Sequence, residues 1–244
     1  MSAPGSLSAL LNSASAYYRR AGHFAWHFAR GKLKGDPVFR AILEHGLLAD
    51  RARLLDLGAG QGLLAAWLLA ARSCQASEQD GAWPAHWPAP PELQTYLGIE
   101  INAQEVRRAQ RAFALDPGVS LEIVHGDIRE VDYGTPDAVV ILDVLHFLDH
   151  VSQERVLRRV RAALAPRGLL LLRVGDADGG IGFTLSKAVD HTVALVRRGR
   201  WTALHCRPLR EWQRLLSELG FRTRTVPMSV GTPFTNMLLV SELP

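Results

Sequence analysis

The sequence predicts an α/β fold in which a seven-stranded, mostly parallel sheet carries helices on both faces and ends in a C-terminal antiparallel hairpin. Between residues 53 and 174, short apolar runs alternate with helical patterns. The run at 168–174 holds almost no polar residue, as expected of a strand buried on both faces. Two later strand-like runs, 221–227 and 236–241, are joined by a Gly-Thr-Pro turn, which favours a hairpin.

The N-terminal part of the chain is predicted to be helical. A chain of 244 residues, 48% of them apolar, is long enough to bury one core of this kind. Residues 1–50 are expected to form a helical extension that acts as a lid. Residues 1–16 are expected to form its leading helix. They are not interpreted as an export signal, because such a signal would need a positively charged start. Asp36 is expected to cap a second helix over 38–45, which Gly46 would end.

Residues 51–244 are predicted to form the sheet domain, in which strands and helices alternate. The predicted strands are residues 53–57, 96–101, 120–125, 138–142, 168–174, 221–227 and 236–241. The predicted helices are residues 63–71, 103–115, 151–164 and 209–219. Continuous apolar strands that alternate with helices indicate a parallel sheet, because parallel neighbours need a crossover connection.

Two segments exceed the minimal strand and helix repeat. Residues 73–95 are rich in Pro, Ala and Trp and are expected to form a surface insertion. Residues 176–207 follow the fifth strand and contain a helical pattern over 185–197. Because open α/β sheets bind ligands beside the carboxyl ends of their strands, 176–207 is a candidate substrate lid.

The charge of the chain is mildly basic, with 28 Lys and Arg against 24 Asp and Glu and a net charge of +4. Arginines gather in three helical stretches, namely Arg107, Arg108 and Arg111, then Arg155, Arg158, Arg159 and Arg161, then Arg197, Arg198 and Arg200. Solvated helix faces are the favoured interpretation of these groups. An anionic substrate, a carrier protein and RNA are the alternatives.

The cysteines and the hydropathy pattern predict a cytoplasmic protein. Cys74 and Cys206 lie far apart and have no CxxC partner, so neither a disulfide framework nor a metal site is expected. A reducing compartment fits this pattern. No run of about 18 uncharged apolar residues occurs, and a membrane span is therefore not expected.

A glycine-rich turn follows the first predicted strand. Asp56 ends the strand, and three alternate glycines come next, at Gly58, Gly60 and Gly62. Such a turn lets a ligand approach the backbone and leads into a helix N-terminus whose free N–H groups face the crevice. Dinucleotide-binding turns end in a third small residue at the place that Leu63 occupies here. The turn therefore predicts a nucleoside-like ligand and departs from the dinucleotide pattern.

Three further motifs follow the glycine turn in order: Gly98-Ile99-Glu100-Ile101, His125-Gly126-Asp127-Ile128 and Asp143-Val144-Leu145-His146. Together with the turn they resemble the class I S-adenosylmethionine-dependent methyltransferases, and the resemblance runs from about residue 52 to the C-terminus. It implies a Rossmann-like sheet, S-adenosylmethionine as methyl donor and S-adenosylhomocysteine as product.

The resemblance also implies a role for each motif. Glu100 would accept hydrogen bonds from both ribose hydroxyls, a task suited to a carboxylate. Asp127 would accept from the adenine amino group, with Ile128 against the ring. Asp143 and Val144 would close over the methionine end of the cofactor, and the glycine turn would contact the same end. The positions thereby assigned to the cofactor are Asp56, Gly58, Ala59, Gly60, Glu100, Ile101, Asp127, Ile128, Asp143 and Val144.

The place of the second strand decides the role of Glu100. An acidic residue normally follows a nucleotide-binding glycine turn by about 20 residues, and Glu100 lies roughly twice as far from Gly60. The predicted insertion at 73–95 accounts for the difference. If Glu78 or Asp80 ended the second strand instead, Glu100 would lose its role, but no apolar run precedes either residue. Glu100 is therefore favoured.

Candidate residues for catalysis and for the methionine carboxylate come from two regions. Methyl transfer is an in-line displacement, and a hydroxyl acceptor must also lose a proton. His146 follows the fourth strand and is the first candidate base, with His150 second, although a histidine here could instead be a packed residue that shapes the pocket. Arg19 or Arg30 would pair with the methionine carboxylate if the N-terminal helices fold over the cofactor. An ordinary amphipathic helix is the alternative for that region.

The acceptor is predicted to be a small molecule. After the fourth strand there is neither an Asn or Asp followed by Pro-Pro and an aromatic residue nor a nucleophilic cysteine, which disfavours methylation of nucleic-acid bases. Residues 199–242 resemble methyltransferases of bacterial aryl polyene pigment pathways. This resemblance implies a phenolic or related oxygen as acceptor and an acidic acyl carrier protein as a candidate partner. The alternatives are an RNA methyltransferase and a non-catalytic module that binds a nucleoside or a protein.

Overall fold

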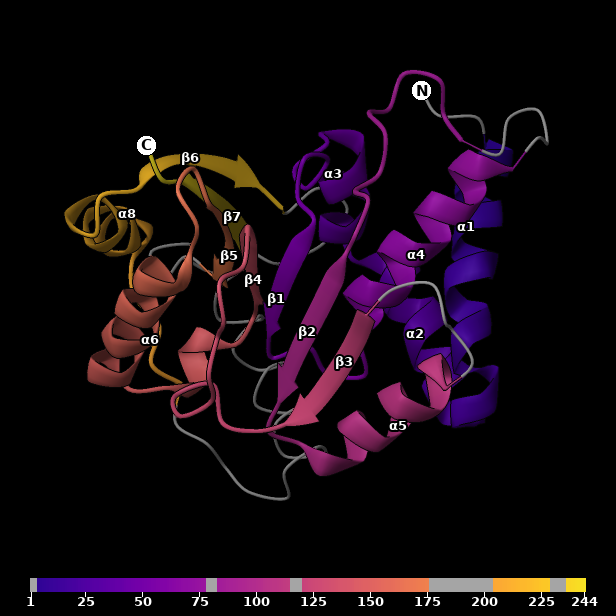
Figure 1. The fold of residues 1–244 in the computed structure, drawn as a ribbon, viewed down its shortest axis with the longest axis horizontal. Helices are drawn as coiled ribbons and strands as arrows, with labels where there is room; N and C mark the ends of the chain where they lie inside the picture. Colours follow the sequence, from indigo (N-terminus) through magenta and orange to yellow (C-terminus); the bar gives the residue numbers. More distant parts are fainter. Residues whose placement is uncertain (1–3, 78–82, 115–119, 176–203, 229–235) are drawn as a thin grey trace. The chain divides into compact units, whose positions relative to one another are not determined.

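The computed structural model describes residues 4–77, 83–114, 120–175, 204–228 and 236–244 (Figure 1). The strands within these residues are β1 (Arg53–Leu57), β2 (Thr95–Glu100), β3 (Ser120–His125), β4 (Ala138–Leu142), β5 (Leu169–Gly175), β6 (Arg222–Pro227) and β7 (Asn236–Glu242). They form one sheet in the order β3-β2-β1-β4-β5-β7-β6. β2 pairs with β3, and β4 with β5, in parallel, whereas β7 is antiparallel to both β5 and β6. The predicted Rossmann-like fold with antiparallel C-terminal strands is confirmed.

The chain divides into two compact units. The first comprises residues 1–54 and 59–126, and the second comprises residues 55–58 and 127–244. The helices of the predicted N-terminal extension therefore belong to the same unit as β2 and β3.

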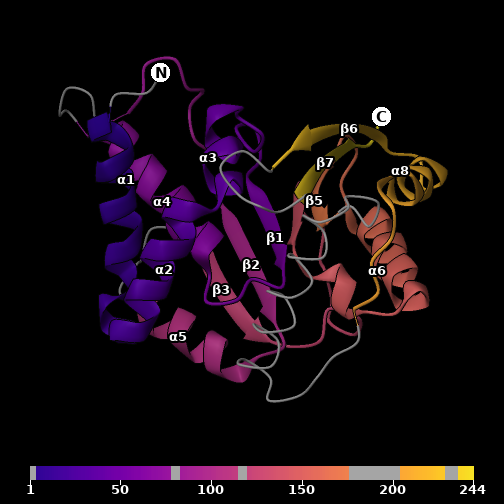
Figure 2. The same ribbon diagram turned by 180° about the vertical axis from the view of Figure 1, so that it is seen from behind.

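Helices of the N-terminal extension pack against helices of the sheet domain within the first unit. The helical elements of this unit are α1 (Pro4–Ala16), η1 (Tyr17–Ala21), α2 (His23–Gly35), α3 (Pro37–Glu44), α4 (Leu63–Ala76) and α5 (Ala103–Phe113). α1 contacts α2 and α4, and η1 contacts α2 and α5 (Figure 2). Ala14, Ala25 and Ala29 are almost fully buried, and side chains of this size let helices approach closely.

The start and end of α3 follow the predicted signals. The Asp36 carboxylate accepts a hydrogen bond of 3.1 Å from the backbone N–H of Val38, as an N-cap does. Gly46 has a φ of +57° beyond the helix end, and a Cβ there would lie 2.8 Å from Cγ of Pro88. Both predictions are confirmed, and the close approach of Pro88 gives a second reason for glycine at position 46.

The predicted insertion at 73–95 begins later than expected. α4 continues to Ala76 and does not end near residue 71, because Cys74 extends the buried face of the helix by another turn. Trp87 is 5% exposed, so part of the segment packs into the first unit and is not a surface loop. Residues 78–82, which include Glu78 and Asp80, lie outside the described residues.

The second unit holds the remaining strands together with η2 (Leu145–Phe147), α6 (His150–Ala163) and α8 (Leu209–Glu218). Asp149 caps α6 by accepting from the backbone N–H of Ser152 at 2.9 Å. Gly220, with a φ of +84°, follows the end of α8 as predicted. The turn of the predicted hairpin and most of the predicted substrate lid, residues 176–203, fall outside the described residues.

Membrane spans and metal sites were both sought in the described part of the chain. No helix in it is both long and apolar enough to cross a membrane. It also contains no group of three or more His, Cys, Asp or Glu residues that could hold a metal ion. Cys74 is buried in α4, and this burial raises the pKa of its thiol.

Candidate functional site

Glu100 is joined to the glycine turn in the first unit. It is the last residue of β2, which confirms the predicted place of the second strand. One carboxylate oxygen accepts a hydrogen bond of 2.9 Å from the backbone N–H of Gly60, and the other accepts one of 2.7 Å from the N–H of Asn102. Residues 40 positions apart in sequence are thereby brought together.

The glycine turn is crowded on one side and open at its centre. A Cβ on Gly62, where φ is +79°, would lie 2.6 Å from Ile123 and 2.7 Å from Phe113. Gly60 has a φ of +57°, but a Cβ there would meet no atom within 4 Å. The backbone at Gly60 therefore borders open space, as close approach of a ligand requires.

The N-terminal helices are attached to the same turn. Tyr18 is fully buried and donates from its hydroxyl to the carbonyl oxygen of Gln61 at 3.0 Å. The Gln61 side chain donates to the carbonyl oxygen of Ala25 at 3.2 Å. Sequence reasoning missed both contacts, because no local pattern links a tyrosine to a glutamine 43 residues away.

The two arginines predicted to pair with a methionine carboxylate lie in this N-terminal layer. Arg30 donates to the Asn12 side chain at 2.7 Å and to Ser15 at 3.4 Å, and its guanidinium lies 5.8 Å from the ring of Trp26. Arg19 is exposed at the surface of η1. Arg30 thus joins α1 to α2, and a role toward a ligand stays a prediction for both arginines.

Gly58 and Val144 lie against each other in the second unit. Gly58 has a φ of +85°, and a Cβ there would lie only 2.2 Å from Cγ2 of Val144. Asp56, at the end of β1, is 4% exposed. The turn therefore tolerates no side chain at Gly58, and two of the predicted cofactor residues are brought into contact.

Asp143 is held by an arginine that the prediction did not include. Its φ of +59° is unusual for a residue with a side chain. Arg173, in the middle of β5, donates from Nε to one carboxylate oxygen at 2.8 Å and from Nη2 to the other. The Arg173 side chain is 2% exposed and the Asp143 side chain 29%. A single charge in an otherwise apolar strand was the sequence signal that could have found this pair.

Asp127 is held in a similar way by Arg129. Its carboxylate accepts from the backbone N–H of Arg129 at 2.9 Å and from the guanidinium at 2.6 Å. These hydrogen bonds and the charge of Asp127 raise the pKa of Arg129. Ile128 is buried, and its carbonyl oxygen accepts from Arg159 at 3.0 Å. Ile101, by contrast, follows the end of β2 and is 47% exposed.

The two predicted catalytic histidines lie near a third. His146 is half-buried in η2, and His150 is the exposed first residue of α6. The backbone N–H of His205 donates to the carbonyl oxygen of His146 at 2.8 Å, and the His205 ring lies 6.0 Å from that of His150. The structure therefore gathers His146, His150 and His205 in the second unit.

The sequence was compared with family models and with known proteins. Residues 55–170 match the family described as methyltransferase domain. A carboxy-S-adenosyl-L-methionine synthase from Chromohalobacter salexigens is 36% identical over 84 residues, which is 34% of this chain and 31% of that protein. The aligned stretch therefore spans about a third of the relative's length.

Solved structures of two methyltransferases resemble this chain in fold at low sequence identity. The magnesium protoporphyrin IX methyltransferase of Synechocystis PCC 6803, with bound S-adenosylhomocysteine, aligns over 97% of both chains with a TM-score of 0.59 and 18% identity. Human N-acetylserotonin methyltransferase, in complex with S-adenosylmethionine, aligns over all of this chain and 60% of its own, with a TM-score of 0.60 and 17% identity. At these identities the likeness concerns the fold.

Proposed function

We propose that this chain is a class I S-adenosylmethionine-dependent methyltransferase that transfers the methyl group of S-adenosylmethionine to an oxygen of a small molecule. The observation that carries the proposal is the hydrogen bond between Gly60 and Glu100. It places a carboxylate beside a glycine turn that is open to a ligand, within one compact unit.

The residues around Glu100 fit the donor. A carboxylate has about four acceptor positions, and backbone N–H groups occupy one on each oxygen of Glu100. One position on each oxygen is left, which matches the two neighbouring hydroxyls of a ribose. The open side of Gly60 gives room for the atoms of S-adenosylmethionine that join the ribose to the methionine part. In the second unit, Asp127 and Asp143 keep the roles toward adenine and methionine that the family resemblance implies, and Arg129 and Arg173 fix their carboxylates.

His146 is the residue that we propose to receive the acceptor's proton. When bound, S-adenosylmethionine would supply a methyl group on a sulfonium. Attack of the acceptor oxygen on this methyl carbon would break the C–S bond and release S-adenosylhomocysteine. A phenol or alcohol must lose its proton as the new C–O bond forms. A ring nitrogen of His146 takes this proton, because imidazole titrates near neutrality. His150 is the second candidate for this role.

Replacing Glu100 with alanine should weaken the binding of S-adenosylhomocysteine. Loss of its hydrogen bonds is expected to cost about 1–3 kcal/mol, or roughly 5- to 150-fold in Kd. Isothermal titration calorimetry measures this effect, with Glu122→Ala on the neighbouring strand as the control for loss of an exposed carboxylate. Unchanged affinity in Glu100→Ala would reject the role of Glu100 in cofactor binding. A wild-type chain that binds NAD but neither S-adenosylmethionine nor S-adenosylhomocysteine would reject the proposed function.

The carrier protein proposed as a partner would meet α6. Of the four arginines of this helix, Arg159 and Arg161 bond to backbone carbonyls, whereas Arg155 and Arg158 are exposed and have no partner among the described residues. They line a shallow hollow of about 420 Å³ next to Val151, which is 73% exposed. An apolar residue flanked by two unpaired cations suits an acidic helix with one apolar side chain.

Reversing both of these charges should therefore weaken the binding of a purified holo acyl carrier protein. Arg155→Glu combined with Arg158→Glu is expected to raise the Kd by roughly 30-fold, at about 1 kcal/mol for each exposed pair, and added salt should weaken the wild-type complex. Surface plasmon resonance provides the measurement. Arg214→Glu on α8 is the control, since Arg214 is 73% exposed on another helix. Equal weakening by all of these variants would show only a general effect of net charge.

A further inference from the structure

Gln153 is a fully buried polar side chain on the apolar face of α6. Its neighbours on this face are Val156, Leu157 and Val160, each of which is also fully buried. Burial of an amide without hydrogen bonds costs free energy, and a leucine would fill the same space without that cost. The presence of glutamine therefore has to be explained by the groups that its amide holds.

The amide nitrogen of Gln153 lies within hydrogen-bond distance of three backbone carbonyl oxygens from two segments, which share its two N–H groups. It lies 3.1 Å from the carbonyl oxygen of Leu145, 2.9 Å from that of Leu148 and 2.7 Å from that of His205. Leu145 and Leu148 flank His146 in sequence. Together with the bond from His205 N–H to the His146 carbonyl, these contacts hold residues 204–207 against the turn that carries His146.

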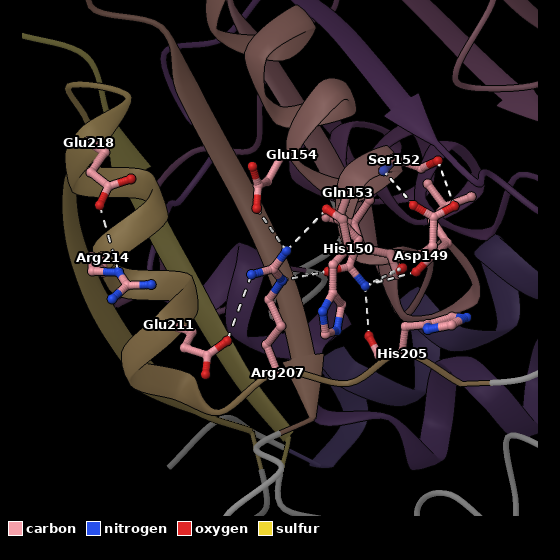
Figure 3. A network of polar contacts seen from close by, with 12 residues as sticks. Asp149, His150, Ser152, Gln153, Glu154, His205, Arg207, Glu211, Arg214 and Glu218 are labelled. Carbon is pink, nitrogen blue, oxygen red and sulfur yellow. Dashed lines mark hydrogen bonds and ion pairs between the residues drawn. The ribbon is translucent and has the colours of Figure 1, made fainter.

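Arg207 fixes the direction of the Gln153 amide. The Arg207 guanidinium is buried and donates to Oε1 of Gln153 at 2.8 Å. Because a guanidinium only donates, Oε1 must face it, and the nitrogen of the amide must then face the carbonyls. Arg207 also donates to the carbonyl oxygen of His150 and to Glu154, both at 3.0 Å, as Figure 3 shows.

We propose that Gln153 is a positioning residue for His146 and His205 in the transfer reaction. It holds the backbone on both sides of His146 and the carbonyl of His205, while Arg207 holds the backbone of His150. The oriented amide of Gln153 thus determines where the imidazole rings of His146 and His205 lie. The catalytic part of this inference rests on the proposed function. The effect of Gln153 on the positions of the histidine rings does not, and it is measured by a separate experiment.

Two substitutions separate the donor role of Gln153 from its volume. Gln153→Glu keeps the size and the acceptor for Arg207 but has no N–H to donate to the carbonyls, and Gln153→Leu keeps only the size. The readout is the NMR signal of each histidine ring Cε1–H in protein labelled with ¹³C-histidine, assigned by single His→Gln variants. The exposed ring of His23 in α2, in the other unit, is the internal reference. Arg214→Ala, on the exposed face of α8, is the matched control variant.

In both Gln153 variants the signals of His146 and His205 should move, and that of His23 should not. S-adenosylhomocysteine should still bind within about twofold of the wild-type affinity, which shows that the chain is folded. With a phenol that the wild type methylates, kcat should fall by about 10- to 100-fold while KM for S-adenosylmethionine is unchanged. Wild-type ring signals in Gln153→Glu would overturn the proposal, even if Gln153→Leu differs, because packing alone would then explain the residue. A wild-type chain that binds no adenosyl compound would overturn the proposed function instead, and the ring signals would still decide whether Gln153 positions the histidines.

Discussion

Replacing Asp143 with alanine is expected to lower the free energy of unfolding by about 3 kcal/mol or more. The substitution leaves the guanidinium of Arg173, which is 2% exposed, without the carboxylate that it faces. Removal of one partner from a buried ion pair costs about 3–5 kcal/mol because the other charge stays buried. The partial exposure of Asp143 places the expected loss near the lower end of this range. Urea denaturation followed by circular dichroism measures it.

A double variant tests whether the loss comes from the stranded charge. Asp143→Leu combined with Arg173→Met replaces both partners by apolar side chains, and such replacements are often neutral or stabilising. The double variant should therefore recover most of the stability that Asp143→Ala loses. If the double variant is less stable than Asp143→Ala, the charge of Arg173 is not the cause of the lost stability. Other hydrogen bonds in the turn after β4 would then have to explain it.

Replacing Gly58 with alanine should destabilise the second unit by a similar amount. The residue would adopt a φ of +85°, which costs about 1–2 kcal/mol for a residue with a Cβ. The Cβ would also lie 2.2 Å from Val144, and forcing a methyl group into a filled space adds about 1–3 kcal/mol. Thermal denaturation of the variant should show a clearly lower Tm than that of the wild type.

Two related variants separate backbone strain from the clash. Gly60→Ala has the same sign of φ, at +57°, but its Cβ meets no atom within 4 Å, so it should show the strain alone. Gly58→Ala combined with Val144→Ala makes room for the new methyl group and should recover part of the loss. Equal destabilisation in Gly58→Ala and Gly60→Ala would mean that contact with Val144 contributes nothing.

Local sequence patterns were sufficient to predict the strands and the place of Glu100. β1, β3 and β4 have the predicted bounds, and each is followed by glycine or by a polar residue that ends the strand. β2 ends one residue earlier than predicted, and this end leaves Glu100 beside the turn. The end of α4 was misjudged because Arg72 and Ser73 interrupt the apolar pattern, although Cys74 continues the buried face.

The residues that hold the candidate site could not be predicted in the same way. Tyr18 with Gln61, and Gln153 with His205, are contacts between residues 43 and 52 positions apart, and no periodicity records them. Arg173 is different, since a charged residue inside an apolar strand must have a partner, and this signal in the sequence was overlooked. Sequence patterns thus propose candidates for ligand contact more readily than they reveal the residues that hold those candidates in place.

The bond between Tyr18 and Gln61 also bears on how this protein can be divided. The stretch shared with the methyltransferase family begins at residue 55, inside β1, whereas the first compact unit includes residues 1–54. A fragment cut at the family limits would keep the glycine turn but lose the hydroxyl of Tyr18 and the carbonyl of Ala25 that restrain it. The stretch that matches the family and the stretch that holds the glycine turn in place are therefore different lengths of chain, and a graft of the candidate donor site into another scaffold should carry the first 54 residues with it.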